Sequence, residues 1–262
     1  MLVSVITPTT GNPLLKKALQ SVQDQDYDNI EHLIVIDGKE REEKAQNILS
    51  EMQLIKPTHI MSLPYPTGKN RYNGHRIYGS SCYIANGDYL IFLDEDNWFE
   101  PFHVSSLVES ILQDQLDWAY ALRNIVDEQG QFIAHDDCES LGKWPAYNEQ
   151  YHHVDTSCYC LKKEIAVFLS PIWYRKFREP GLMSPDMALC NILVQDFPNC
   201  DTTGLYSVNY RIGATELSVK PEFFLYGNSL MAAKYPDGFP WRKASSISAV
   251  DNTFLENLNW FF

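Results

Sequence analysis

Short apolar runs alternate with helical patterns through the first 115 residues of this chain, and this alternation limits the possible folds more than any other feature. The strand candidates are "LVSVIT" (2–7), "HLIVIDG" (32–38), "HIMSL" (59–63) and "DYLIFLD" (88–94). Helices are expected over residues 13–22 and 40–52, in a stretch that ends near 85–87, and over 101–113. Because parallel strands need long crossover connections, the pattern predicts an α/β fold with a Rossmann-like, mixed but mainly parallel sheet and helices on both faces.

The second half of the sequence is less regular. Its expected elements are a hairpin over 118–137, a strand over 153–164 that runs into a helix, a helix over 184–197 and a strand over 206–213. Gln129 and Gly130 form the hairpin turn, and Ser184 and Pro185 are the cap and first residue of the later helix. No repeat, low-complexity tract or linker interrupts the chain, so residues 1–262 are expected to form a single domain.

The charge balance excludes some partners. With 34 acidic and 21 basic residues the net charge is −13, so a nucleic acid duplex or an anionic membrane surface would be repelled. No apolar run approaches the roughly 20 residues of a transmembrane segment, and the start "MLVSVITP" lacks the basic lead of a signal peptide. We therefore expect a cytoplasmic protein without a transmembrane segment or a nucleic-acid partner.

The cysteines are expected to be reduced and mostly buried. They are Cys82, Cys138, Cys158, Cys160, Cys190 and Cys200. Cys158 and Cys160 would share one face of the expected strand, with His152 and His153 just upstream. A zinc site is the alternative to ordinary core thiols, although this spacing matches no usual C-x-x-C knuckle.

Polar clusters follow three of the expected strands. They are Thr7-Pro8-Thr9, Asp37-Gly38 and Asp94-Glu95-Asp96. The carboxyl ends of parallel strands meet at one edge of a sheet, where ligands bind, so the three clusters are expected to line one crevice. Crowded carboxylates repel one another unless a cation or hydrogen bonds share the site. The pattern indicates a metal and sugar-nucleotide site, and a solvated strand end followed by a helix cap is the alternative.

The N-terminal hundred residues resemble the inverting family 2 glycosyltransferases of GT-A fold. The resemblance lies in "VSVITPTTGN", "LIVIDG" and "ANGDYLIFLDEDNW", with looser matches at "VDTSCYCLKKE" and "SPDMALCNIL". It implies one GT-A domain in which residues 1–115 bind the nucleotide sugar and residues 116–262 bind the acceptor. Such an enzyme moves a sugar, with inversion, from a UDP, GDP or dTDP sugar to a glycan or a lipid-linked acceptor.

The resemblance also implies which residues recognise the nucleoside. In the family, the segment that matches Thr7, Pro8 and Thr9 wraps the nucleoside, and the residue that matches Asp37 accepts a hydrogen bond from the base. A carboxylate suits the N–H of uracil or of guanine. Ordinary Thr-Pro and Asp-Gly turns are the alternative explanation of these residues.

The acids after residue 93 are implied to hold the diphosphate end of the donor. The leaving diphosphate develops negative charge and needs a divalent cation or fixed donors. By resemblance, Asp96 holds Mn²⁺ or Mg²⁺ as a hard oxygen ligand, and Asp94 contacts the ribose and reaches the metal through water. Glu95 is the third acid of this donor-binding group.

The segment "KNRYNGHR" (69–76) contains the basic cluster nearest to the expected crevice, and Arg71 is the candidate contact to the base or phosphate. Here the chain departs from the family, which usually shows an Ala-Arg-Asn triplet before the acidic strand, whereas "RIYGSSCYIANGDY" has none. Basic side chains on a solvated loop are the alternative.

Asp186 is the candidate general base. Many family members carry Glu-Asp followed three residues later by Leu, and this chain has Pro185, Asp186 and Leu189, so the first acid is lost. The base takes the proton of the acceptor hydroxyl as it attacks the anomeric carbon. A helix N-terminus tends to lower the pKa of Asp186, so burial or a nearby carboxylate would have to oppose that. A plain acid at a helix start is the alternative.

Two other functions share these features. A sugar-phosphate nucleotidyltransferase also uses a Rossmann-like sheet and Mg²⁺, but the first loop lacks the Gly-rich, Arg-containing segment that cradles a triphosphate. A catalytically inactive sugar-nucleotide-binding domain is the second alternative, and the presence of Asp94, Asp96 and Asp186 argues against it.

Overall fold

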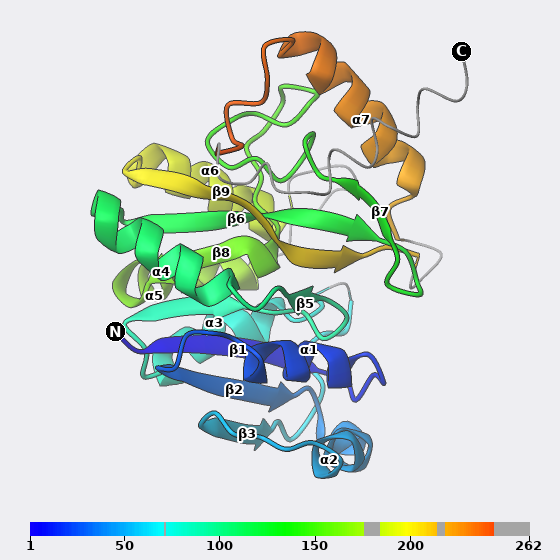
Figure 1. The fold of residues 1–262 in the computed structure, drawn as a ribbon. Coiled ribbons are helices and arrows are strands. Elements are labelled where there is room, and N and C mark those ends of the chain that lie inside the picture. The colour runs from blue at the N-terminus through cyan, green and yellow to red at the C-terminus, as the bar shows by residue number, and fades with distance from the viewer. Residues whose placement is uncertain (71, 176–183, 214–217, 244–262) are drawn as a thin grey trace.

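A mixed β-sheet of nine strands forms the centre of the structure (Figure 1). The computed structural model describes residues 1–70, 72–175, 184–213 and 218–243, and all statements below refer to them. The strands are β1 (Val3–Thr9), β2 (Ile30–Ile36), β3 (Thr58–Ser62), β4 (Tyr89–Phe92), β5 (Trp98–Phe99), β6 (Trp118–Val126), β7 (Phe132–His135), β8 (Tyr159–Lys162) and β9 (Cys200–Arg211). Their order is β3-β2-β1-β4-β8-β6-β9-β5, with β7 paired to β6.

Most of the described strands run in one direction, as the sequence predicts. β2, β1 and β4 are joined by parallel pairing, and β3 is parallel to β2. β8 is antiparallel to both β4 and β6, so β6 runs the same way as β4, and β9 is parallel to β6. The carboxyl ends of β1, β2 and β4 therefore share one edge of the sheet, on the right in Figure 1. Every residue of β1 and β2 is buried, which explains their continuous apolar runs.

Helices cover both faces of the sheet, which confirms the expected layers. The described helices are α1 (Leu15–Gln23), α2 (Glu42–Ser50), α3 (His75–Ile84), α4 (His103–Asp114), α5 (Lys163–Leu169), α6 (Pro185–Asp196) and α7 (Pro221–Lys234). Short 3₁₀ turns occur at η1 (Lys39–Arg41), η2 (Thr156–Cys158) and η3 (Ser170–Tyr174). In Figure 1, α1 and α4 lie in front of the sheet, whereas α3, α5 and α6 lie behind it. None of the helices in the described ranges is both long and apolar enough to cross a bilayer.

Capping contacts set the starts of two helices. The Asn12 side chain accepts the N–H of Leu14 at 3.0 Å, and its carbonyl accepts the N–H of Leu15, so Asn12 sets the start of α1. Ser184 is the cap residue of α6 and Pro185 its first residue. The capping signal at Ser184 and Pro185 therefore located the start of α6 correctly.

One helix and one strand boundary differ from expectation. Strand β8 is shorter than the strand predicted over 153–164, because Cys158 lies in η2 and so does not share a strand face with Cys160. All six cysteines are buried and free, as expected. Helix α7 was not anticipated because apolar side chains surround it: Phe224 is buried, whereas Leu225 and Tyr226 are exposed.

Candidate active site

A cavity of about 360 Å³ lies at the carboxyl ends of β1, β2 and β4. The residues that line it are Pro8, Thr9, Thr10, Asn12, Asp37, Asn73, Gly74, Asp94, Glu95, Asp96, Asn97, Tyr210, Arg211 and Ser218. All three predicted clusters thus contribute side chains to one crevice. Of the remaining predicted site residues, Thr7 and Asp186 lie outside this lining, and Arg71 lies outside the described residues.

Asp94 and Asp96 form a pair of partly buried carboxylates at the end of β4. Burial, followed by the charges of Asp96 and Asp155, raises the pKa of Asp94 to about 8. Burial also raises the pKa of Asp96. The Tyr78 hydroxyl donates to Asp94 Oδ1 at 2.6 Å and orients it. Carboxylates that repel one another in a desolvated site favour a cation, so these residues fit Mg²⁺ or Mn²⁺.

The protein supplies only part of a coordination shell there. Among the described residues, no group of three His, Cys, Asp or Glu side chains is arranged to hold a metal ion. A cation bound by Asp94 and Asp96 would therefore complete its shell with water or with oxygens of a ligand, as Mg²⁺ commonly does with phosphates. Among the described residues, Cys158 and Cys160 are likewise not part of a group of three possible metal ligands, so the structure does not support a zinc site there.

Glu95 faces the loop after β1 rather than its two acidic neighbours. Its carboxylate accepts the hydroxyls of Thr9 and Thr10, both at 2.6 Å, and the N–H groups of Thr10 and Asn12 at 3.0 and 3.2 Å. The middle acid of the triplet therefore fixes the wall of the cavity. The sequence could not separate this contact from direct binding of the donor.

The three residues at the end of β1 have different surroundings. The Thr7 hydroxyl contacts His32 Nε2 at 2.9 Å, and both side chains are fully buried. Burial lowers the pKa of His32 to about 3, so this imidazole is neutral. Pro8 and Thr9 line the cavity, whereas Thr7 does not and instead contacts the buried His32.

Asp37 is almost completely buried at the end of β2 and organises the loop after β3. Its Oδ1 accepts the N–H of Thr67 at 2.5 Å and the Thr67 hydroxyl at 2.8 Å. Its Oδ2 accepts the N–H of Gly68 and a guanidinium N–H of Arg41, both at 3.0 Å. A carboxylate offers about four acceptor positions. A base N–H would therefore have to replace one of the donors already present.

Asp37→Ala is expected to affect both stability and nucleotide binding. The N–H groups of the partly buried Thr67 and Gly68 would lose their acceptor, so the free energy of unfolding should fall by about 1–3 kcal/mol. Loss of a hydrogen bond to the base should weaken UDP binding by about 0.5–1.5 kcal/mol. Urea denaturation and calorimetry measure the two effects, with the exposed Asp28 at the opposite end of β2 mutated to Ala as the control. An unchanged UDP affinity would mean that Asp37 only shapes the loop.

Asp186, the second residue of α6, is tightly held. Its Oδ2 lies 3.2 Å from His153 Nε2, and its Oδ1 accepts the Ser184 hydroxyl and, at 3.0 Å, the N–H of Met187. Burial raises the pKa of Asp186, but the hydrogen bonds from His153 and Ser184 outweigh burial and hold this pKa below its ordinary value. The carboxylate is therefore ionised at neutral pH and able to accept a proton.

Arg123, on β6, is the centre of a buried ionic cluster that the sequence did not reveal. Its guanidinium donates to Asp136 Oδ2 at 2.7 Å, to Asp155 Oδ2 at 2.6 Å and to Glu139 Oε2 at 2.5 Å. The Arg123 side chain is 2% exposed. The signal in the sequence was weak, because a single Arg in an apolar strand does not identify its partners.

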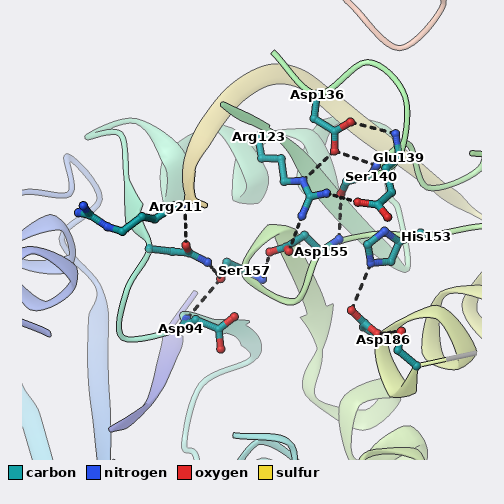
Figure 2. Close-up of polar contacts among 12 residues, drawn as sticks. Asp94, Arg123, Asp136, Glu139, Ser140, His153, Asp155, Ser157, Asp186 and Arg211 are labelled. Carbon is teal, nitrogen blue, oxygen red and sulfur yellow. Dashed lines mark hydrogen bonds and ion pairs between the residues drawn. The ribbon is translucent and has the colours of Figure 1, made fainter. Parts of the chain in front are cut away.

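This Arg123 cluster connects the acids of the cavity with Asp186 (Figure 2). Asp155 Oδ1 accepts the N–H of Ser157 at 3.0 Å, and its own N–H donates to Ser140 Oγ at 2.8 Å. Ser157 Oγ in turn accepts the N–H of Asp94 at 3.3 Å. His153, two residues before Asp155, reaches Asp186. One short segment therefore contacts both predicted halves of the site.

Arg211 is the one positively charged side chain among the described residues that line the cavity. Its Nε donates to the carbonyl of Asp96 at 3.3 Å, and its backbone N–H donates to Asn97 Oδ1 at 3.1 Å. No motif in the sequence marks Arg211, because it lies at the end of β9, more than a hundred residues from the acids. Its positive charge therefore lies next to Asp96 at the cavity.

Comparisons with known proteins identify a matching family and a related sequence. Residues 4–163 match the model of a family described as glycosyl transferase family 2. A relative from Campylobacter jejuni, GalNAc(5)-diNAcBac-PP-undecaprenol beta-1,3-glucosyltransferase, is 30% identical over 110 residues, which are 41% of this chain and 33% of that protein. This chain thus matches only about a third of that relative.

Solved structures of S. aureus TarS residues 1–349 have a similar fold. The structure in complex with UDP-GlcNAc has a TM-score of 0.59 at 15% identity and covers 91% of this chain and 67% of that one. The complex with UDP has a TM-score of 0.55, also at 15% identity, with coverages of 91% and 66%. At this identity the likeness shows a shared fold.

Proposed function

Since the chain belongs to glycosyl transferase family 2, and is thus a glycosyltransferase, we propose that it transfers a sugar with inversion from a nucleoside diphosphate sugar, assisted by a divalent cation. One observation carries this proposal: Asp37, Pro8, Asp94 and Asp96 line a single cavity. The charge of Asp186 acts on Asp94, so the candidate base lies near that cavity. Family membership sets aside the nucleotidyltransferase alternative.

The donor proposed first is a UDP sugar. The similar TarS structures include complexes with UDP-GlcNAc and UDP, which supports uridine over the GDP and dTDP alternatives. The name of the C. jejuni relative contains a polyprenyl diphosphate acceptor, which supports a lipid-linked acceptor over a free glycan. A cytoplasmic location, expected from the sequence, is part of the same proposal.

The transfer would be a single displacement. Asp186 accepts the proton of the acceptor hydroxyl while the hydroxyl oxygen forms a bond to the anomeric carbon. The bond between that carbon and the diphosphate oxygen breaks, and its electron pair leaves with the nucleoside diphosphate. Asp94 and Asp96 would hold the divalent cation, which offsets the negative charge on the departing diphosphate. Arg211 adds a positive charge on the same side of the cavity.

Calorimetric titration with UDP tests the proposal directly. UDP is expected to bind in the presence of Mn²⁺ and to bind at least tenfold more weakly in EDTA, because no cation then offsets the negative charge of the diphosphate next to Asp94 and Asp96. Asp96→Asn should reduce the difference between the two conditions. GDP and dTDP in parallel titrations test the choice of base. If none of the three nucleotides binds with or without Mn²⁺, the proposal is wrong.

A further inference from the structure

We propose that His153 is a positioning residue for the transfer, which holds the Asp186 carboxylate in place and ionised and which is itself held by the Arg123 cluster. This inference rests on the proposed function, in which Asp186 accepts the proton of the acceptor. The relation among Arg123, Asp155, His153 and Asp186 is visible in Figure 2.

Accessibility separates the roles of the two side chains. The His153 side chain is 7% exposed and the Asp186 side chain is 20% exposed, and 3.2 Å separates His153 Nε2 from Asp186 Oδ2. An acceptor hydroxyl can therefore reach the carboxylate, whereas the imidazole lies behind it. His153 Nδ1 is buried and has no hydrogen-bond partner among the described residues, so Asp186 is the polar contact that orients the ring.

The backbone on both sides of His153 is fixed. Its carbonyl accepts the N–H of Gly142 at 2.8 Å. Two residues later, the side chain of Asp155 is bound by Arg123 and its N–H by Ser140. The neighbouring His152 turns elsewhere, because its Nδ1 meets the carbonyl of Gly142 at 2.8 Å. The backbone that carries the imidazole is thus held in place where the ring contacts Asp186.

The charges around the pair favour an imidazolium next to a carboxylate. Arg123 carries one positive charge and contacts three carboxylates, so this neighbourhood has an excess of negative charge. Burial lowers the pKa of His153, but the contact with Asp186 and the charge of Glu139 outweigh burial and raise it, against the opposing charge of Arg123.

Titratable groups from other elements also face Asp186. They are His75 at the start of α3, Asp94 after β4, Tyr159 on β8 and Cys190 on α6. Burial lowers the pKa of His75, and burial raises the pKa values of Tyr159 and Cys190, so these three groups are neutral near pH 7. Among the residues that the structure describes, His153 is therefore the cation that directly contacts Asp186.

His153→Gln is the variant that tests the inference, because the Gln amide can still donate to Asp186 but carries no charge. In the wild type, activity should persist to low pH because Asp186 stays ionised. In His153→Gln, no cation opposes the effect of burial, so the pKa of Asp186 rises. The acidic limb of kcat/KM should therefore move to higher pH by about 1–3 units. At pH values above that limb, kcat/KM should stay within about tenfold of the wild type, because the Gln amide keeps the hydrogen bond to Asp186.

His152→Gln is the matched control, and its acidic limb should coincide with that of the wild type. His153→Leu, which also removes the donor, should lower kcat at every pH while leaving the UDP affinity unchanged. A purely structural role would lower kcat/KM in His153→Gln equally across the pH range. That result, or an unshifted limb, would overturn the inference.

A measurement without catalysis separates this inference from the proposed function. Histidine side-chain ¹⁵N chemical shifts of the labelled wild type should include one ring, identified by its absence in His153→Gln, that stays protonated above the ordinary pKa of about 6.5. If Asp186→Asn retained full activity, the assigned base would be wrong, but this titration would still show whether the ion pair exists. A ring that titrates at or below about 6.5 would refute the pair.

Discussion

The Asp186→Asn variant is expected to bind UDP as tightly as the wild type and to transfer sugar about 10²–10⁴-fold more slowly. The amide keeps the volume of the side chain but cannot accept the proton of the acceptor hydroxyl. Asp186 lies outside the lining of the cavity that Asp94 and Asp96 share, which is why the donor affinity should not change. Single-turnover transfer together with the Kd for UDP separates the chemical step from binding.

The control for this prediction lies on the same helix. Asp196 is exposed at the last position of α6, and Asp196→Asn should transfer sugar at the wild-type rate. If Asp186→Asn does so as well, another residue accepts the proton. Asp155 is a poor alternative, because its carboxylate is held by Arg123 and Ser157.

Arg123→Met is expected to lower the free energy of unfolding at pH 7 by about 3–5 kcal/mol, the usual cost of leaving buried charges without their partner. Three carboxylates would remain in a largely buried site. Urea denaturation measures the loss. The control is Lys16→Met, because Lys16 forms an ion pair with Glu51 in which both side chains are mostly exposed, and such pairs contribute about 0–1 kcal/mol.

The deficit of Arg123→Met should also depend on pH in a defined direction. Burial raises the pKa of Asp136, but the charge and hydrogen bonds of Arg123 outweigh burial and hold this pKa below its ordinary value. In the wild type, the Asp136 contribution to stability is present above the unfolded pKa and is lost as the pH falls through the folded one. Without Arg123 the buried carboxylates protonate more easily, so the deficit should shrink as the pH is lowered from 7 to 5. A deficit that grows on acidification would contradict this explanation.

Local patterns in the sequence located most elements because their physical causes are local. The continuous apolar runs predicted β1 and β2, since strands buried on both faces need apolar side chains at every position. Ser184 and Pro185 marked the start of α6 for the same kind of reason. Helix α7 was not predicted, because a helix with apolar residues on all sides shows no periodic pattern of hydrophobicity.

The sequence by itself also determined that three polar clusters would meet, because the carboxyl ends of parallel strands must share an edge. Only the tertiary structure decided what each acid contacts. The carboxylate of Glu95 accepts hydrogen bonds from the end of β1 and the loop after it, and that of Asp37 accepts hydrogen bonds from the loop after β3. The carboxylate of Asp186 contacts His153, which is 33 residues away in the sequence. Side-chain partners depend on the register of distant strands and on the packing of helices across the sheet, which local periodicity does not encode. Motifs along the sequence therefore predicted the family and the position of the cavity. The partners of Arg123 in the ionic cluster could be identified only from the tertiary structure.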